Sequence, residues 1–312
     1  KERVSISSFL AESTSNSIRK AQWLAEIEQL NLDTHLSEAV MSVTDLIIDD
    51  CYEHWSQCDD FGIELRIDSH ALYRQDGGKL GLGSSAAVST ALTGLLLNLM
   101  GEELSQQEFH HRIHQRHQSG VGSGLDLATS LVGGIITYRK STDTNEFAEW
   151  AHLQKWPQNL FGHIVTVKHS VSTPALIQAF EAWKQSSASV FDKVMSQMGV
   201  CANQTAGALK RGDLSGFLEG FTEYGVRVGR MGELMGRELL TAPHQRILEE
   251  ATKLGVSYKP CGAGGGDVGL LLSDNYDATS RACQRLIEIG FNTMPFVIAE
   301  DGLLVDGAAP WQ

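Results

Sequence analysis

Residues 81–100 read GLGSSAAVSTALTGLLLNLM and are followed by Gly101. Two glycines let the backbone turn tightly and approach a ligand, and the apolar run after them predicts a helix from Ser84 to Met100 that ends at Gly101. The first turn of a helix has unpaired N–H groups and the positive end of the helix dipole, so it binds phosphate. The hydroxyl of Ser84 or Ser85 is the expected ligand of Mg²⁺. The expected phosphate-binding residues are Gly81, Leu82, Gly83, Ser84, Ser85 and Ala86.

Other interpretations of this stretch stay open or are disfavoured. Residues 81–86 formally match a dinucleotide-binding fingerprint, with two glutamates at 102–103 at about the right distance, but the polar residues 73–79 precede it where an apolar strand should. A Walker A lysine is disfavoured because Leu80 follows Lys79 where Ser or Thr should stand. A tight turn before a core helix remains an alternative.

A second glycine segment, GVGSGLDLA at residues 120–128, ends in Asp126. One interpretation is that Asp126 is the N-cap of a helix that begins at the apolar Leu127. The other is that a rigid backbone holds Asp126 at a cleft, where it faces a substrate hydroxyl. The segment alone does not distinguish them.

A third glycine segment, KPCGAGGGD at residues 259–267, precedes an apolar strand at 268–271. Four glycines among the five residues 262–266 cost backbone entropy on folding, and a turn alone requires one or two. A loop that lies against a ligand explains the excess. The expected loop residues are Gly262, Ala263, Gly264, Gly265, Gly266 and Asp267.

The 312 residues suffice for two domains, and a composition of 42% apolar and 20% charged residues is typical of a globular protein. A formal charge of −13 argues against a nucleic-acid partner. No apolar run reaches the ~18 residues of a membrane helix and no signal peptide is visible, so no membrane partner is expected. Five widely spaced cysteines indicate a reducing, cytoplasmic setting. Because the chain does not begin with Met, we expect residues upstream.

Periodicity predicts strands and helices in runs that fit an α+β fold rather than a regular βαβ repeat. We place a domain boundary near residue 155, giving domains 1–155 and 156–312. A capping box at Ser105 opens a helix that reaches about Gln118. The other expected helices are 36–51, 173–183, 189–211, 214–235, 243–254 and 278–289, and the expected strands are 62–68, 135–138, 164–167, 268–272, 296–299 and 303–305.

At its three glycine segments the sequence resembles the GHMP kinases, in order and spacing, over roughly residues 60–310. The resemblance implies a two-domain α+β fold, with an N-terminal domain like ribosomal protein S5 domain 2 and a ferredoxin-like C-terminal domain. It implies ATP and Mg²⁺ as cofactors, a small-molecule substrate and a catalytic role for Asp126. The family's first motif, a Pro-Gly-Lys segment that supplies a catalytic lysine, is absent from this chain.

Within that family the sequence resembles the phosphomevalonate kinase branch. The features are the Gly266-Asp267 ending and a Ser172-Thr173 pair after a strand, while Val268 departs from the Cys usual there. Mevalonate kinases carry a Mg²⁺-binding Glu where Gln115 stands. The expected acceptor is therefore phosphomevalonate. Mevalonate or another small-molecule acceptor, a decarboxylase of the same fold and a non-catalytic sensor are the alternatives.

Basic side chains raise two further questions. Histidines recur at helical spacing within residues 110–117, and we interpret them as a solvated helix face rather than a metal cluster, because no carboxylate sits among them. The candidates for contact with an acceptor phosphate, each of which is otherwise a solvated surface cation, are Lys79, Arg139, Lys140 and Lys168.

Overall fold

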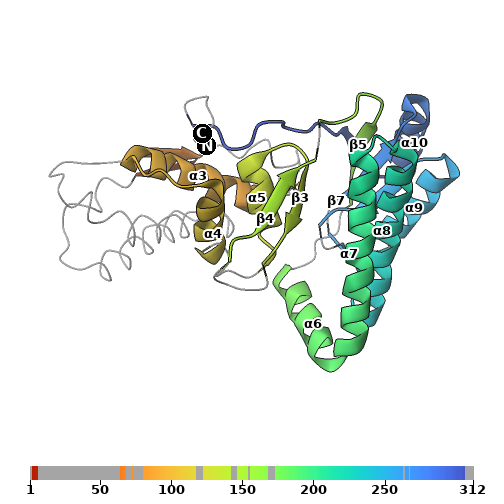
Figure 1. The fold of residues 1–312 in the computed structure, drawn as a ribbon. Helices are drawn as coiled ribbons and strands as arrows, with labels where there is room; N and C mark the ends of the chain where they lie inside the picture. The colour runs from red at the N-terminus through yellow and green to blue at the C-terminus, as the bar shows by residue number, and fades with distance from the viewer. Residues whose placement is uncertain are drawn as a thin grey trace. The chain divides into compact units, whose positions relative to one another are not determined.

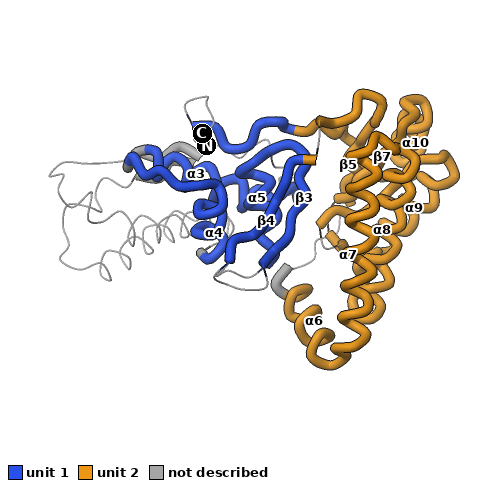
Figure 2. Tube along the Cα trace, viewed as in Figure 1, with its two compact units in different colours: residues 1–152, 299–312 blue, residues 153–298 orange. Residues whose placement is uncertain are grey.

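The computed structural model describes part of the chain in detail, and it divides the chain into two compact units. Unit 1 contains residues 1–152 and 299–312, and unit 2 contains residues 153–298 (Figure 2). The described residues are 2–5, 64–67, 72, 80–116, 122–141, 146–153, 155–167, 173–262, 264–266 and 268–305. The helix expected at 36–51 lies outside them. No described helix combines the length and the apolar character needed to cross a membrane.

Unit 1 combines three described helices with two strand pairs (Figure 1). Both strand pairs are antiparallel, β1 with β2 and β3 with β4. The short strand β4 was missed from the sequence. The elements are β1 Glu2–Ser5, β2 Glu64–Ile67, α3 Ser84–Met100, α4 Gln106–Arg116, α5 Leu125–Val132, β3 Ile136–Arg139 and β4 Glu149–His152.

The helix boundaries of unit 1 follow from local chemistry. Helix α3 runs from Ser84 to Met100 as predicted and ends at Gly101, whose left-handed backbone (φ 67°) lets its N–H cap the last carbonyls. The expected capping box opens α4: the Glu108 carboxylate accepts from the Ser105 amide at 2.9 Å, and the Glu108 amide donates to the Ser105 hydroxyl at 3.3 Å. The apolar faces of α3, α4 and α5 then pack together around Phe109, Ile113, Leu127 and Leu131.

Residues 299–305 belong to unit 1, whereas the sequence analysis assigned all of 156–312 to the second domain. Leu303 is buried in the core of unit 1, and its amide donates to the Leu131 carbonyl at 3.1 Å. The amide of Gly134 donates to Ala299 at 2.8 Å. These contacts replace the expected terminal strands: residues 296–299 and 303–304 are not strand, and Val305 alone forms a bridge.

Unit 2 is built on a four-stranded antiparallel sheet in the order β6-β7-β5-β8. Taken in chain order, its elements form a β-α-β-β-α-β pattern in which four helices stand in the first helical position, as in ferredoxin-like folds. The α+β prediction is therefore confirmed. The elements are β5 Phe161–Thr166, α6 Thr173–Ser186, α7 Ala188–Lys210, α8 Leu214–Met235, α9 Ala242–Lys253, β6 Ser257–Pro260, β7 Val268–Ser273, α10 Tyr276–Glu288 and β8 Asn292–Pro295.

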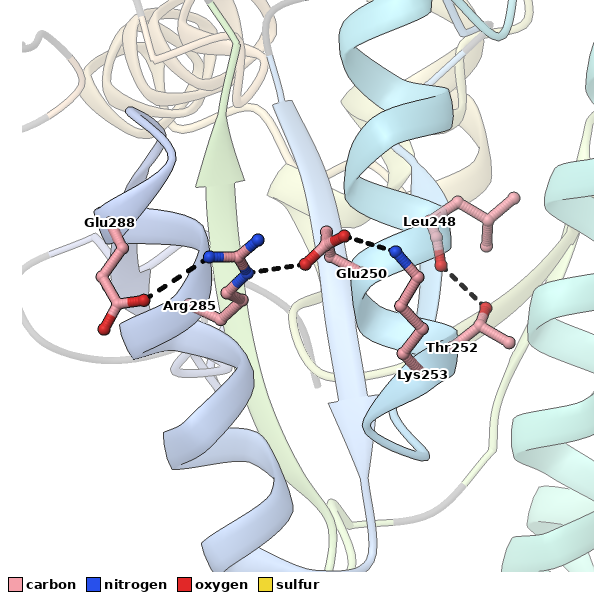
Figure 3. A network of polar contacts seen from close by, with 6 residues as sticks. All are labelled: Leu248, Glu250, Thr252, Lys253, Arg285 and Glu288. Carbon is pink, nitrogen blue, oxygen red and sulfur yellow. Dashed lines mark hydrogen bonds and ion pairs between the residues drawn. The ribbon is translucent and has the colours of Figure 1, made fainter.

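The main core of unit 2 lies between one face of this sheet and helices α9 and α10. Val165, Tyr258 and Leu271 occupy neighbouring strands on the same face and are at most 1% exposed. At the surface, Glu250 of α9 binds Lys253 at 2.6 Å and Arg285 of α10 at 2.7 Å (Figure 3). Hydrogen bonds from these two cations lower the pKa of Glu250 to about 2, so the carboxylate stays ionised and links the two helices.

The return of the C-terminal segment to unit 1 can be tested with two adjacent leucines. Leu303 is 8% exposed and Leu304 is 47% exposed. We expect Leu303→Ala to lower the free energy of unfolding by about 2–4 kcal/mol, because it opens a cavity in the core. Leu304→Ala, which deletes the same atoms at the surface, should change it by less than about 0.5 kcal/mol. Equal effects in chemical denaturation would contradict this assignment.

Candidate active site

The first glycine segment forms a left-handed turn that leads into α3. Gly81 and Gly83 have φ of 71° and 75°, a region that favours glycine. Gly83 is the N-cap, no side chain caps the helix, and its first turn carries no acidic residue. The first-turn N–H groups of α3 therefore keep the anion-binding capacity that the sequence suggested.

The side chains of this segment differ in what they offer a ligand. The Ser85 Oγ atom is buried and has no hydrogen-bond partner. Leu82 is 43% exposed, whereas Ala86 is fully buried and offers a ligand only its backbone N–H. An orphaned hydroxyl beside uncapped amides fits a bound phosphate and its metal ion, because burying a hydroxyl without a partner otherwise costs free energy.

Asp126 lies beside this turn. A Cβ atom built on Gly83 would be 3.8 Å from the Asp126 Cβ atom. Asp126 is exposed and is the second residue of α5, whose N-cap is Gly124, so the N-cap alternative from the sequence is wrong. Its Oδ1 atom accepts from the Leu127 amide at 3.0 Å. One carboxylate and one anion-binding helix start thus come together within unit 1.

The histidines of α4 support the segment before Asp126. His110 is 3% exposed, so the interpretation as a solvated helix face is wrong for this residue. Its ring stacks on His114 at a centroid distance of 5.8 Å, and burial lowers the pKa of both. Across the described residues, no group of three or more His, Cys, Asp or Glu side chains is arranged to hold a metal ion. The helical spacing marked these residues, but it could not distinguish a buried support from a solvated face.

Two of the four candidate phosphate-binding cations can be placed. Lys140 donates from Nζ to the Gly122 carbonyl. Arg139 lies 3.9 Å from Glu149 in an exposed ion pair, which contributes little to stability. Lys79 and Lys168 lie outside the described residues.

The third glycine segment forms a tight loop in unit 2. Gly262, Gly264 and Gly265 have φ of 61°, 84° and 65°. The Gly265 amide donates to the Leu239 carbonyl. Ala263, Asp267 and Ser172 lie outside the described residues, and Thr173 is described only as the first residue of α6. The functional assignment of this loop stays a prediction.

His244 contacts the last described residue of this loop, Gly266. It is 0% exposed, and its Nε2 atom is 3.1 Å from the Gly266 carbonyl while its Nδ1 atom is 2.6 Å from the Tyr258 hydroxyl. In a neutral ring Nε2–H donates to the carbonyl and Nδ1 accepts from the hydroxyl. The position of His244 in a helix gave no sequence signal for this role.

Lys259, which lies in strand β6 just before the glycine loop, was also missed. Its Nζ atom donates to the Pro260 carbonyl at 2.9 Å and lies 5.6 Å from the Phe221 ring and 5.7 Å from the Tyr224 ring. Burial lowers the pKa of this amine. A cation that faces two aromatic rings is stabilised by their negative faces. The rings of Phe221 and Tyr224 therefore keep the charged amine of Lys259 next to the glycine loop.

Comparison with known proteins finds similar sequences for several segments of this chain. Residues 42–134 match the family described as GHMP kinases N terminal domain. The phosphomevalonate kinase of Streptomyces sp. (strain CL190) is 27% identical over 263 residues, which is 77% of this chain and 70% of that protein. The mevalonate kinase of Pyrococcus furiosus is 44% identical over 62 residues, or 19% of each chain.

A solved structure extends the likeness to most of the chain. The Streptococcus pneumoniae phosphomevalonate kinase in complex with phosphomevalonate and AMPPNP aligns with a TM-score of 0.67 and 17% identity. The alignment covers 84% of this chain and 81% of that one. At this identity the likeness is one of fold.

Two glycines of the third segment provide a matched test of how tightly the loop is packed. A Cβ atom on Gly264 would lie 2.7 Å from the Leu239 carbonyl oxygen and 3.0 Å from Val228, whereas one on Gly262 would meet nothing within 4 Å. Both substitutions to Ala incur left-handed strain of about 1–2 kcal/mol. Gly264→Ala should cost about 1–3 kcal/mol more, because backbone atoms must move. Equal denaturation midpoints for Gly262→Ala and Gly264→Ala would rule out this packing constraint.

Proposed function

We propose that this chain, which contains a GHMP kinase N-terminal domain and has the GHMP kinase fold, is an ATP-dependent phosphotransferase whose acceptor is phosphomevalonate. The observation that carries the proposal is that Asp126 lies next to Gly83. A Cβ atom built on Gly83 would be 3.8 Å from the Asp126 Cβ atom. An anion-binding helix start and a carboxylate at one place are what phosphoryl transfer requires, because its catalysis is mostly positioning and charge stabilisation.

Residues of α3 are assigned to the nucleotide. The backbone amides that follow Gly81 and Gly83 would hold the β- and γ-phosphates of ATP, and the Ser85 hydroxyl, which has no partner, or that of Ser84 would hold Mg²⁺. When bound, Mg²⁺ neutralises charge that develops on the phosphate oxygens. A site with few protein ligands suits this ion, since Mg²⁺ keeps several waters and uses substrate phosphates as ligands.

The reaction forms one bond and breaks one. An oxygen of the acceptor phosphate attacks the γ-phosphorus of ATP, the bond from that phosphorus to the β–γ bridging oxygen breaks, and ADP leaves with the electron pair. The acceptor phosphate is already an anion, so no base has to remove a proton. We assign to Asp126 the orientation of the acceptor and the stabilisation of a neighbouring cation.

Phosphomevalonate is preferred over mevalonate for two reasons. Gln115 stands where a mevalonate kinase would carry a carboxylate for Mg²⁺, and its amide nitrogen lies 2.7 Å from His111 Nε2. A relative that matches over 77% of this chain is named a phosphomevalonate kinase. The high identity of a 62-residue segment to a mevalonate kinase keeps mevalonate as the second candidate.

Nucleotide binding can be tested with two hydroxyls of the same helix. Ser85 and Thr90 each have a buried oxygen without a hydrogen-bond partner, so neither Ser85→Ala nor Thr90→Val should lower the melting temperature. We expect Ser85→Ala to weaken binding of Mg·ATP about tenfold in calorimetry, the effect of losing roughly 1.4 kcal/mol. Thr90→Val lies farther along α3 and should bind normally. Wild-type affinity in a folded Ser85→Ala protein would contradict the assignment.

The acceptor can be tested in a coupled assay for ADP. The full-length protein should consume ATP much faster with phosphomevalonate than with mevalonate. Asp126→Asn should lower kcat through geometry and charge while the shape of its pH profile is kept, because a general base, typically worth about 10²–10⁴-fold, is not required. A faster rate with mevalonate would move the chain to the other branch and leave the kinase assignment intact.

A further inference from the structure

The backbone before Asp126 is held by side chains from two other elements of unit 1. Residues 122–124 have three consecutive carbonyl groups, and each is contacted by a different side chain. The Lys140 Nζ atom donates to Gly122, the Tyr138 hydroxyl donates to Ser123 at 2.6 Å, and the His110 Nε2 atom lies 2.8 Å from the Gly124 oxygen. Tyr138 belongs to β3, Lys140 follows it directly, and His110 belongs to α4, so one short segment is fixed from two directions.

The fit of Gly124 shows how little freedom this segment has. Its φ is 76°, and a Cβ atom there would lie 2.8 Å from the His114 ring and 3.1 Å from both the His110 Nε2 atom and the Tyr138 hydroxyl. The side chains therefore close directly around the backbone. The carbonyl groups of a surface loop usually accept hydrogen bonds from water, which does not impose a single conformation. Here three side chains contact the carbonyls and restrict the backbone to one conformation.

Two of the three donors, His110 and Tyr138, are themselves held by neighbouring rings. The His110 ring contacts Trp150 edge-on at 5.2 Å and Tyr138 at 5.8 Å, and it stacks on His114. Burial together with the nearby Asp126 carboxylate raises the pKa of Tyr138 to about 12, so its hydroxyl remains a donor at any ordinary assay pH. The buried ring of His110 and the partly buried rings of His114, Tyr138 and Trp150 thus contact one another beside the carbonyls of residues 122–124.

The first turn of α5 carries this constraint to Asp126. The Ala128 amide donates to the Gly124 carbonyl at 3.0 Å, the same oxygen that His110 contacts. The Leu125 amide donates to the Ser123 hydroxyl at 3.2 Å. A shift of residues 122–124 therefore moves the start of the helix and the carboxylate beside Gly83 with it.

We propose that Tyr138, His110 and Lys140 are positioning residues that set the place of Asp126 by holding the carbonyls of residues 122–124. This inference rests on the proposed function, because it needs a catalytic role for Asp126. Misplacement of a reacting or orienting group by about 1 Å can cost about 10²-fold in rate. A single donor out of three should cost less.

The first test uses Tyr138→Phe in the full-length protein, which removes one donor and keeps the ring. Hydrogen exchange of the amides in residues 122–128 should become faster, and kcat with ATP and phosphomevalonate should fall about tenfold while both KM values stay within about twofold. Tyr276→Phe is the matched control, because Tyr276 is a 62% exposed tyrosine of unit 2. It should change neither measurement.

A rescue experiment separates the hydrogen bond from packing. His110→Gln retains an N–H donor of similar reach, whereas His110→Leu fills comparable space without one. We expect the Gln variant to keep a clearly higher kcat than the Leu variant at matched melting temperature. If both lose activity in proportion to stability alone, His110 has only a structural role and the inference is wrong for this residue.

A double-mutant cycle tests the link to Asp126. In the Asp126→Asn background, Tyr138→Phe should cause no further fall in kcat, because the two changes remove one function. An additive fall would overturn the inference, as would unchanged hydrogen exchange in Tyr138→Phe. Full activity of Asp126→Asn would instead overturn the proposed role of Asp126, and the exchange data would still report whether the side chains hold the segment. The two failures are therefore distinguishable.

Discussion

Two helices of unit 1 have a left-handed glycine at the N-cap, which has no side chain to cap the helix, and the candidate site depends on this constraint. Gly83 precedes α3 with φ 75° and Gly124 precedes α5 with φ 76°. A serine or aspartate at either N-cap would normally use its own oxygen to satisfy the first amides. Glycine leaves them available, and it lets the preceding backbone approach within contact distance of other groups.

The two helix starts use this availability differently. At α5 the free amides are consumed locally, by the Ser123 hydroxyl and by the carboxylate of Asp126 itself. At α3 the first-turn amides have no side-chain cap, and Ser85 adds a hydroxyl without a partner. The start of α5 thus holds the Asp126 carboxylate in place, whereas the start of α3 can still bind an anion.

Much of the fold follows from local signals in the sequence, and the differences have identifiable causes. The bounds of α3 and α8 and the capping box at Ser105 match the predictions, because they depend on residues near in sequence. Strands β4, β6 and β8 were missed, because their sequences (EWAH, SYKP and NTMP) contain few apolar residues and two of them end in proline. The association of residues 299–305 with α5 depends on contacts far apart in sequence, which periodicity does not report.

The same distinction applies to the site. The glycine pattern identified the helix starts, because left-handed turns restrict residue type at those positions. It did not identify His110, Tyr138 or Lys259, because a histidine, tyrosine or lysine is compatible with most surroundings. Their contacts come from three-dimensional packing. The aliphatic part of Lys259, for example, lies against Gly225 of α8. A Cβ atom on that glycine would be 3.1 Å from the lysine Cγ atom. Such residues have to be found in the structure.

The chain path has a consequence for the order of folding during synthesis. Unit 2 is an uninterrupted segment, residues 153–298, whereas unit 1 combines residues 1–152 with the last residues of the chain. A ribosome therefore releases every residue of unit 2 before Leu303, which fills the core of unit 1. Domains fold as units as they emerge, so the second unit can complete its core first. The core of unit 1, which carries Asp126, is completed only after translation reaches the C-terminal segment. Until then α3 and α5 lack the side chain of Leu303 that packs against them.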